Sequence, residues 1–116
     1  MGHLFYWTYF ISYTHCSLYN PGYPKNDIGR NFGYPREEYN YCSLCKFYVK
    51  KVSNADHCFH CDICIEKQDH HCRWTGHCIG KNNYISFFIF IGSSICIICY
   101  LFILLIAIII SSSANN

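Results

Sequence analysis

The feature that most constrains this chain is a dense group of cysteines and histidines between residues 42 and 78. Seven cysteines and five histidines fall in this stretch, and Cys-x2-Cys spacing recurs at Cys42-x2-Cys45, Cys58-x2-Cys61 and Cys61-x2-Cys64. This is the short spacing of a zinc knuckle. A chain of 116 residues buries little apolar core, so metal ligation should fix the backbone here. We therefore expect a small zinc-stabilised cysteine-rich domain, mostly irregular, with short β hairpins.

Zinc is favoured over disulfides for these cysteines. The chain has ten cysteines, which in a short secreted protein would suggest disulfides. However, the residues after Met1 show no basic region and no small-residue cleavage site typical of a signal peptide. The cysteines are also mixed with histidines at metal-ligand spacing.

The number of ligands leaves one cysteine over. A structural zinc site takes four ligands, often three cysteines and one histidine, so two sites would use six of the seven cysteines. Cys72 follows His71 directly, and neighbouring residues rarely reach one metal together. If His71 binds metal, Cys72 is a free thiol beside Asp69 and His70, in a setting that would activate it. The alternative is that Cys72 is an unused or structural thiol.

A second constraint is the uncharged apolar run from Tyr84 to Ile110. Its 27 residues would form a helix about 40 Å long, enough to cross about 30 Å of hydrocarbon with some tilt. All nine Lys/Arg residues precede it, which predicts a cytosolic cysteine-rich domain. The net charge of +2 is too small to suggest nucleic acid as a partner.

The remaining segments complete the expected organisation of the chain. Residues 1–19 are aromatic-rich and read as a partial membrane helix or an interfacial segment. Residues 20–40 form a polar linker, residues 41–83 the zinc domain, residues 84–110 the transmembrane α-helix and residues 111–116 a non-cytosolic tail. No internal repeat of useful length is evident.

Taken together, these residues resemble a known family. The pattern reads Cys42-x2-Cys45, then His57-Cys58-x2-Cys61-x2-Cys64-x4-Asp69-His70-His71-Cys72-x-Trp74-x3-Cys78-x-Gly80-x2-Asn83-x3-Phe87. It resembles the cysteine-rich domain of the DHHC protein S-acyltransferases (palmitoyltransferases). The resemblance implies two structural Zn²⁺ ions, one held by Cys42, Cys45, His57 and Cys64, and the other by Cys58, Cys61, His71 and Cys78.

The resemblance also implies an activity. Cys72 would be the nucleophile, activated by His70 and Asp69, and would pass a long-chain acyl group from acyl-CoA (palmitoyl-CoA) to a cysteine of a protein substrate. Partners would be the bilayer and proteins with juxtamembrane cytosolic cysteines, in the Golgi, the ER or the plasma membrane. Lys67, Arg73 and Lys81 would meet CoA phosphates or be solvated surface.

Two further expectations concern the extent and activity of the chain. Asn20-Pro21-Gly22 resembles the Asp-Pro-Gly that follows the family's second membrane helix, so the chain would be a fragment lacking the first and fourth helices. The alternative function is a catalytically inactive, membrane-tethered zinc module that binds proteins. Such a module would keep the eight ligands without needing Asp69, His70 or Cys72.

Overall fold

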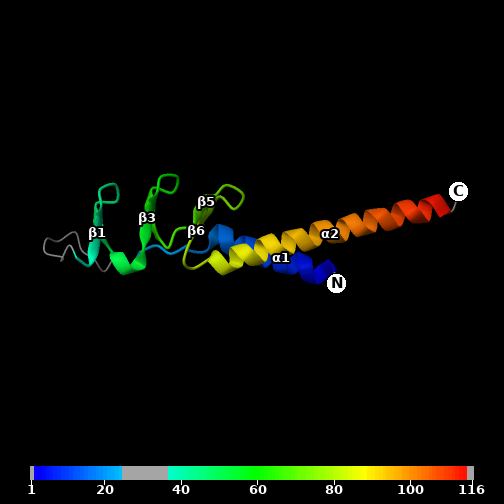
Figure 1. Cartoon of the computed structure of the whole chain (residues 1–116), viewed down its shortest axis with the longest axis horizontal. Helices are drawn as coiled ribbons and strands as arrows, with labels where there is room; N and C mark the ends of the chain where they lie inside the picture. Colours follow the sequence, from blue (N-terminus) through cyan, green and yellow to red (C-terminus); the bar gives the residue numbers. More distant parts are fainter. Residues whose placement is uncertain (1, 25–36, 115–116) are drawn as a thin grey trace.

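A computed structural model describes residues 2–24 and 37–114, so part of the expected linker (25–36) and the end of the expected tail (115–116) lie outside the described residues. The molecule is elongated, with extents of 81 × 22 × 20 Å. Three hairpins follow one another along its length, and two helices lie side by side at the other end (Figure 1). The fold class is confirmed as a cysteine-rich region of short hairpins followed by one long apolar helix.

Each hairpin is a separate two-stranded antiparallel sheet. The strand pairs are β1 (Tyr39–Cys42) with β2 (Phe47–Lys50), β3 (Ala55–Cys58) with β4 (Ile63–Glu66), and β5 (His70–Cys72) with β6 (His77–Ile79). A short 3-10 helix, η1 (Lys51–Ser53), joins the first hairpin to the second. Isolated two-stranded hairpins are marginal in water, so these strands need another source of stability. The gathered cysteine and histidine side chains can supply it through metal.

The two helices run antiparallel. The first, α1 (Gly2–Leu18), starts beside Tyr100 of α2 (Tyr84–Ala114) and ends beside Asn83. Among the described residues, α2 is the one helix long and apolar enough to cross a bilayer. Most of its large apolar side chains are exposed in the isolated chain, as expected for a helix that contacts lipid or other membrane helices. The expected span of residues 84–110 lies inside α2; the division into domains stays a prediction.

The segment between α1 and the first hairpin is tied to the region before α2. The Asn20 side chain accepts hydrogen bonds from the backbone N–H groups of Gly22 and Tyr23, at 2.8 and 2.7 Å. The Gly22 carbonyl accepts from the Glu66 N–H at 2.7 Å, and the Pro21 carbonyl accepts from the Asn82 N–H at 3.1 Å. These bonds fix the end of β4 and the residues just before α2 against the segment that follows α1.

Gly80 lies where these segments meet, and it has no room for a side chain. A Cβ atom there would stand 2.7 Å from a methyl carbon of Ile65 and 2.8 Å from the Pro21 carbonyl oxygen. We expect Gly80→Ala to destabilise the chain by about 1–3 kcal/mol through overpacking. Thermal unfolding of the zinc-loaded chain in detergent measures this, with Gly92→Ala as the control, because nothing lies within 4 Å of a Cβ at Gly92. Equal melting temperatures for the two variants would contradict the steric argument.

Candidate active site and metal centres

The first cluster lies between the first and second hairpins. The end of β1 and the turn after it provide Cys42 and Cys45, and the second hairpin provides His57 and Cys64. The His57 Nδ1 atom is 3.2 Å from the Cys45 sulfur and 3.7 Å from the Cys42 sulfur. The Cys64 and Cys45 sulfurs are 3.5 Å apart.

The second cluster repeats this arrangement between the second and third hairpins. Its members are Cys58, Cys61, His71 and Cys78. The His71 Nδ1 atom lies 3.6, 3.3 and 3.6 Å from the sulfurs of Cys58, Cys61 and Cys78, in that order. The structure thus brings together the same two groups of four side chains that the family resemblance implies as ligands.

Both clusters suit a tetrahedral zinc ion. Four atoms at 2.0–2.3 Å from one centre lie about 3.5 Å from each other, and the donor atoms of each cluster all fall within 4.8 Å of one another. The sulfurs are close together, but all these cysteines are free thiols. The other ring nitrogen of His57 is buried and makes no hydrogen bond with the described residues, and an Asp62 carboxylate oxygen lies 3.5 Å away. The donor chemistry therefore fits zinc, with the eight residues as proposed ligands.

The three hairpins are structurally equivalent, which sequence inspection missed. Their first strands end at Cys42, Cys58 and Cys72, and their second strands begin five residues later in the same register. Each turn ends on a residue with left-handed φ: 56° at Lys46, 53° at Asp62 and 66° at Gly76. The expectation of no internal repeat was therefore wrong. The signal was present in His57-Cys58-x2-Cys61-x2-Cys64 and His71-Cys72-x2-Thr75-x2-Cys78, but threonine replaces one cysteine in the second copy.

This equivalence places Cys72 at a position that belongs to a metal cluster in the other hairpins. Each cluster takes two cysteines from one hairpin: the cysteine that ends the first strand and the cysteine three residues later. The next hairpin supplies a histidine and a third cysteine. Cys72 is the strand-end cysteine of the last hairpin. Within the described residues it belongs to neither cluster. In the part of the chain that the structure describes, the hairpin of Cys72 is followed by α2 and not by another hairpin that could complete a metal site.

Asp69, His70 and Cys72 form a connected group at the membrane-helix end of the hairpins. The Nδ1 atom of His70 lies 2.7 Å from the Asp69 carboxylate, and the nearby Cys72 thiol adds to the effect of Asp69 in raising the pKa of His70. The Phe87 ring of α2 meets the His70 ring edge to face, with centroids 5.1 Å apart. Cys72 itself is buried in an apolar cluster with Cys16 and Ile79.

The surroundings favour a charged pair of His70 and Cys72. Burial raises the pKa of the Cys72 thiol, but hydrogen bonds from Thr75, His70 and the Trp74 backbone outweigh burial and bring the pKa below its ordinary value. Burial lowers the pKa of His70, but the hydrogen bonds with Asp69 and Cys72 outweigh it and raise the pKa. The lowered pKa of Cys72 increases its fraction of thiolate, the nucleophilic form of cysteine, and the raised pKa of His70 increases the fraction of imidazolium beside it.

Asn83 holds this site together, a role that the sequence did not suggest. Its side chain is fully buried. The amide nitrogen donates to the carbonyls of Cys78 (2.9 Å) and Cys16 (3.4 Å), and the amide oxygen accepts from the Gly80 N–H (2.9 Å). Its backbone carbonyl accepts the first helical hydrogen bond of α2, from Phe87. An asparagine just before a long apolar run is a known signal for a helix start, but its contact with α1 could not be read from it.

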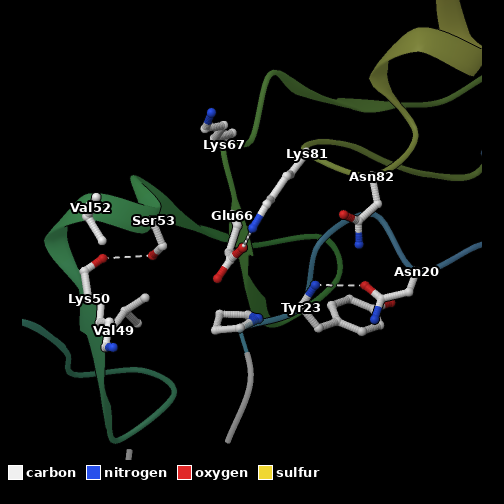
Figure 2. A pocket seen from close by; sticks show the side chains of 11 residues that line it. Asn20, Tyr23, Val49, Lys50, Val52, Ser53, Glu66, Lys67, Lys81 and Asn82 are labelled. Atoms are coloured by element: carbon white, nitrogen blue, oxygen red, sulfur yellow. Dashed lines mark hydrogen bonds and ion pairs between the residues drawn. The ribbon is translucent and has the colours of Figure 1, made fainter. Parts of the chain in front are cut away.

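Lys67, Arg73 and Lys81, which could meet CoA phosphates, differ from one another in their surroundings. Lys81 pairs with Glu66 at 2.6 Å, so its charge is already balanced. Lys50, Lys67 and Lys81 line an open pocket of about 670 Å³ beside η1 and the end of β4. In Figure 2, Lys81 reaches Glu66 while Lys67 points away from this pair. Arg73, which does not line the pocket, lies in the turn of the third hairpin.

The sequence of this chain is similar to that of known proteins. Residues 35–116 match the family model described as DHHC palmitoyltransferase. The chain is 45% identical over 62 residues to human palmitoyltransferase ZDHHC9, covering 53% of this chain and 16% of that protein. It is 44% identical over 68 residues to palmitoyltransferase swf1 of Schizosaccharomyces pombe (57% and 18%) and 44% identical over 62 residues to protein S-acyltransferase 8 of Arabidopsis thaliana (53% and 15%). The match thus spans less than a fifth of each of these relatives.

Proposed function

The chain belongs to the DHHC palmitoyltransferase family, and on this premise we propose that it transfers a long-chain acyl group from acyl-CoA to a cysteine of a protein substrate. The observation that carries the proposal is the connected Asp69–His70–Cys72 group, with Asp69 and His70 joined at 2.7 Å and Cys72 outside both metal clusters. A module that only bound zinc and protein would not need this group. The proposal is therefore a transferase rather than an inactive tether.

In the first half-reaction, the Cys72 sulfur attacks the thioester carbonyl of acyl-CoA. A new carbon–sulfur bond forms to Cys72, the bond to the CoA sulfur breaks, and CoA leaves as its thiol after taking a proton from His70. Asp69 accepts the hydrogen bond from His70 Nδ1, which leaves Nε2 for proton exchange with the thiols. The aspartate also stabilises the charged imidazole while the proton is held there.

The second half-reaction transfers the acyl group to the protein substrate. The substrate thiol gives its proton to His70 and attacks the thioester on Cys72, so that the Cys72 sulfur leaves. The eight proposed ligands would hold two structural Zn²⁺ ions, which would lock the hairpins that carry these groups. Because Cys72 belongs to neither cluster, its sulfur is left for the two proposed half-reactions.

The proposed setting is the cytosolic edge of a membrane of the Golgi, the ER or the cell surface. The helix α2 is a candidate membrane span, and Arg73 and Lys81 lie shortly before it, on the side of the hairpins. Basic residues near a span favour the cytosolic side. The Cys72 site lies beside the start of α2, where an acyl chain could enter the apolar phase while CoA stays in water. The proposed substrates are proteins with cysteines at the same depth.

The proposal is tested by following both half-reactions with the purified chain in detergent or bilayers. Labelled palmitoyl-CoA should give a protein-bound label that hydroxylamine releases, and an added cysteine peptide anchored in the bilayer should take up the label as the protein loses it. A peptide with serine in place of cysteine is the control. A chain that holds two zinc ions but never takes up label would favour the inactive zinc module instead.

Asp69 should have a large effect on the rate. Asp69→Asn keeps the size of the side chain but removes the charge that stabilises the imidazolium of His70. We expect the rate of label uptake to fall by about 10²–10⁴-fold. The first-order rate of acylation at saturating acyl-CoA measures this, with Asp56→Asn, an exposed aspartate of the second hairpin, as the control. A rate within about twofold of the parent would count against a role for Asp69 in proton transfer.

A further inference from the structure

The turn of the third hairpin presents a large exposed aromatic side chain. Residues 73–76 join β5 to β6, and the side chain of Trp74 in this turn is 85% exposed. Its indole makes no hydrogen bond or ring contact with the described residues. A tryptophan ring has an apolar body and one N–H donor, and it is most stable where both are accommodated. Whatever covers this ring therefore lies outside the described part of the chain.

The contacts of the third hairpin place this turn near the ends of the two helices. Cys72, the last residue of β5, shares an apolar cluster with Cys16 in the last turn of α1. Phe87 in the first turn of α2 packs against the same cluster. Trp74 follows Cys72 by two residues. In Figure 1 the third hairpin lies beside the start of α2, and the first two hairpins lie farther from the helices.

The length of α2 places its start in the interfacial layer of a bilayer. Its 31 residues make a helix about 46 Å long, whereas the hydrocarbon core is about 30 Å thick and the headgroup layers extend it to about 40–45 Å. A helix of this length that spans the core reaches into both headgroup layers. The turn of the third hairpin, which lies beside the start of the helix, is therefore close to the headgroups.

The neighbouring side chains suit the same layer. Tyr19 follows α1, and Tyr84 and Phe88 lie in the first turns of α2; all three are exposed. Tryptophan and tyrosine are enriched at the boundary between membrane and water. Arg73, next to Trp74, is also exposed, and its charge keeps the turn among the headgroups rather than in the hydrocarbon. The chemistry of this surface therefore fits lipid at the interface.

We propose that the turn of the third hairpin is an interfacial anchor: the Trp74 ring sits among the headgroups and upper acyl chains of the lipid and holds Cys72 at the depth of the bilayer surface. The proposal deepens the acyl-transfer function and rests on the membrane placement of α2 proposed with it. A thiol at this depth can meet both an acyl thioester and cysteines close to the membrane. The exposed Leu44 and Phe59, in the turns of the other two hairpins, are farther from the helices and should stay in water.

Fluorescence quenching of single-tryptophan chains measures this depth. The chain has two tryptophans, so Trp7→Phe leaves Trp74 alone and Trp74→Phe leaves Trp7 in α1 alone. Each zinc-loaded variant is placed in phosphatidylcholine vesicles with bromine either near the carbonyl end of the acyl chains or near their methyl end. We expect Trp74 to lose more fluorescence to the upper bromines than to the deeper ones, and to be shielded from iodide in the water.

The matched control moves the reporter to the second hairpin. Phe59→Trp, in a chain with phenylalanine at positions 7 and 74, should be quenched by iodide and not by brominated lipid. Trp7 lies eleven residues before the end of α1, so its quenching by lipid shows that the chain is in the bilayer.

The two tryptophans also separate the anchor from the membrane placement. If Trp7 responds to lipid while Trp74 behaves like the Phe59→Trp control, or responds most to the deep bromines, the anchor is wrong and the membrane placement stands. If neither tryptophan responds to lipid, both are wrong. No acyl-CoA is present in these measurements, so a chain that never takes up acyl label can still support or overturn the anchor.

Discussion

Replacing Cys72 with serine is expected to remove the hydroxylamine-labile acyl label completely. The serine hydroxyl is a far weaker nucleophile at neutral pH than a thiol whose pKa lies below its usual value. A serine that did become acylated would carry an oxygen ester, which is more resistant to hydroxylamine. The measurement is uptake of label from palmitoyl-CoA by the zinc-loaded chain, before and after mild hydroxylamine treatment.

The other cysteines outside the metal clusters provide the controls for this result. Cys96 and Cys99 are exposed on α2 and could react with acyl-CoA without catalysis. Cys96→Ser should keep the full label, and Cys72→Ser should lose it while both zinc ions remain bound. If the label survives Cys72→Ser, the acyl-enzyme mechanism is wrong for this chain. If the parent chain takes up no label at all, the membrane-tethered zinc module becomes the better description.

Much of the cysteine-rich region could be predicted because its information is local. A Cys-x2-Cys spacing puts two sulfurs in one turn, and short hairpins follow from that spacing without any knowledge of the rest of the fold. The apolar run from Tyr84 likewise predicts a long helix from composition alone, and α2 begins at that residue. Counting ligands predicted one cysteine that binds no zinc and pointed to Cys72, and the structure places Cys72 outside both clusters.

The parts that could not be predicted depend on contacts between distant segments. Asn83 joins α1, β6 and α2 through one amide group. No local sequence pattern predicts its hydrogen bond with Cys16, which is 67 residues away. Cys16 lies against the Cys72 cluster only because α1 returns antiparallel to α2. The equivalence of the three hairpins was hidden for a different reason: a threonine at position 75 breaks the cysteine pattern while the backbone keeps it.

Replacing Cys58 with serine should have the largest effect on the fold. Cys58 and Cys72 occupy the same position in successive hairpins, but only Cys58 lies in a metal cluster. We expect the parent chain to bind about two zinc ions. Cys58→Ser should bind about one or fewer, because losing a thiolate ligand should weaken zinc binding by at least about 100-fold. Metal analysis of the purified protein measures the content directly.

The matched control is Cys72→Ser, which makes the same chemical change at the equivalent position one hairpin later. It should keep about two zinc ions, since the Cys72 sulfur is in neither cluster. The second hairpin supplies His57 and Cys64 to the first cluster and Cys58 and Cys61 to the second. Disorder of the second hairpin in Cys58→Ser should therefore also weaken zinc binding at the first site. Because Cys78 and His71 of the third hairpin would lose their anchor, the same substitution should abolish acylation of Cys72. Two zinc ions retained in Cys58→Ser, or one lost in Cys72→Ser, would show that the clusters do not share the hairpins in this way.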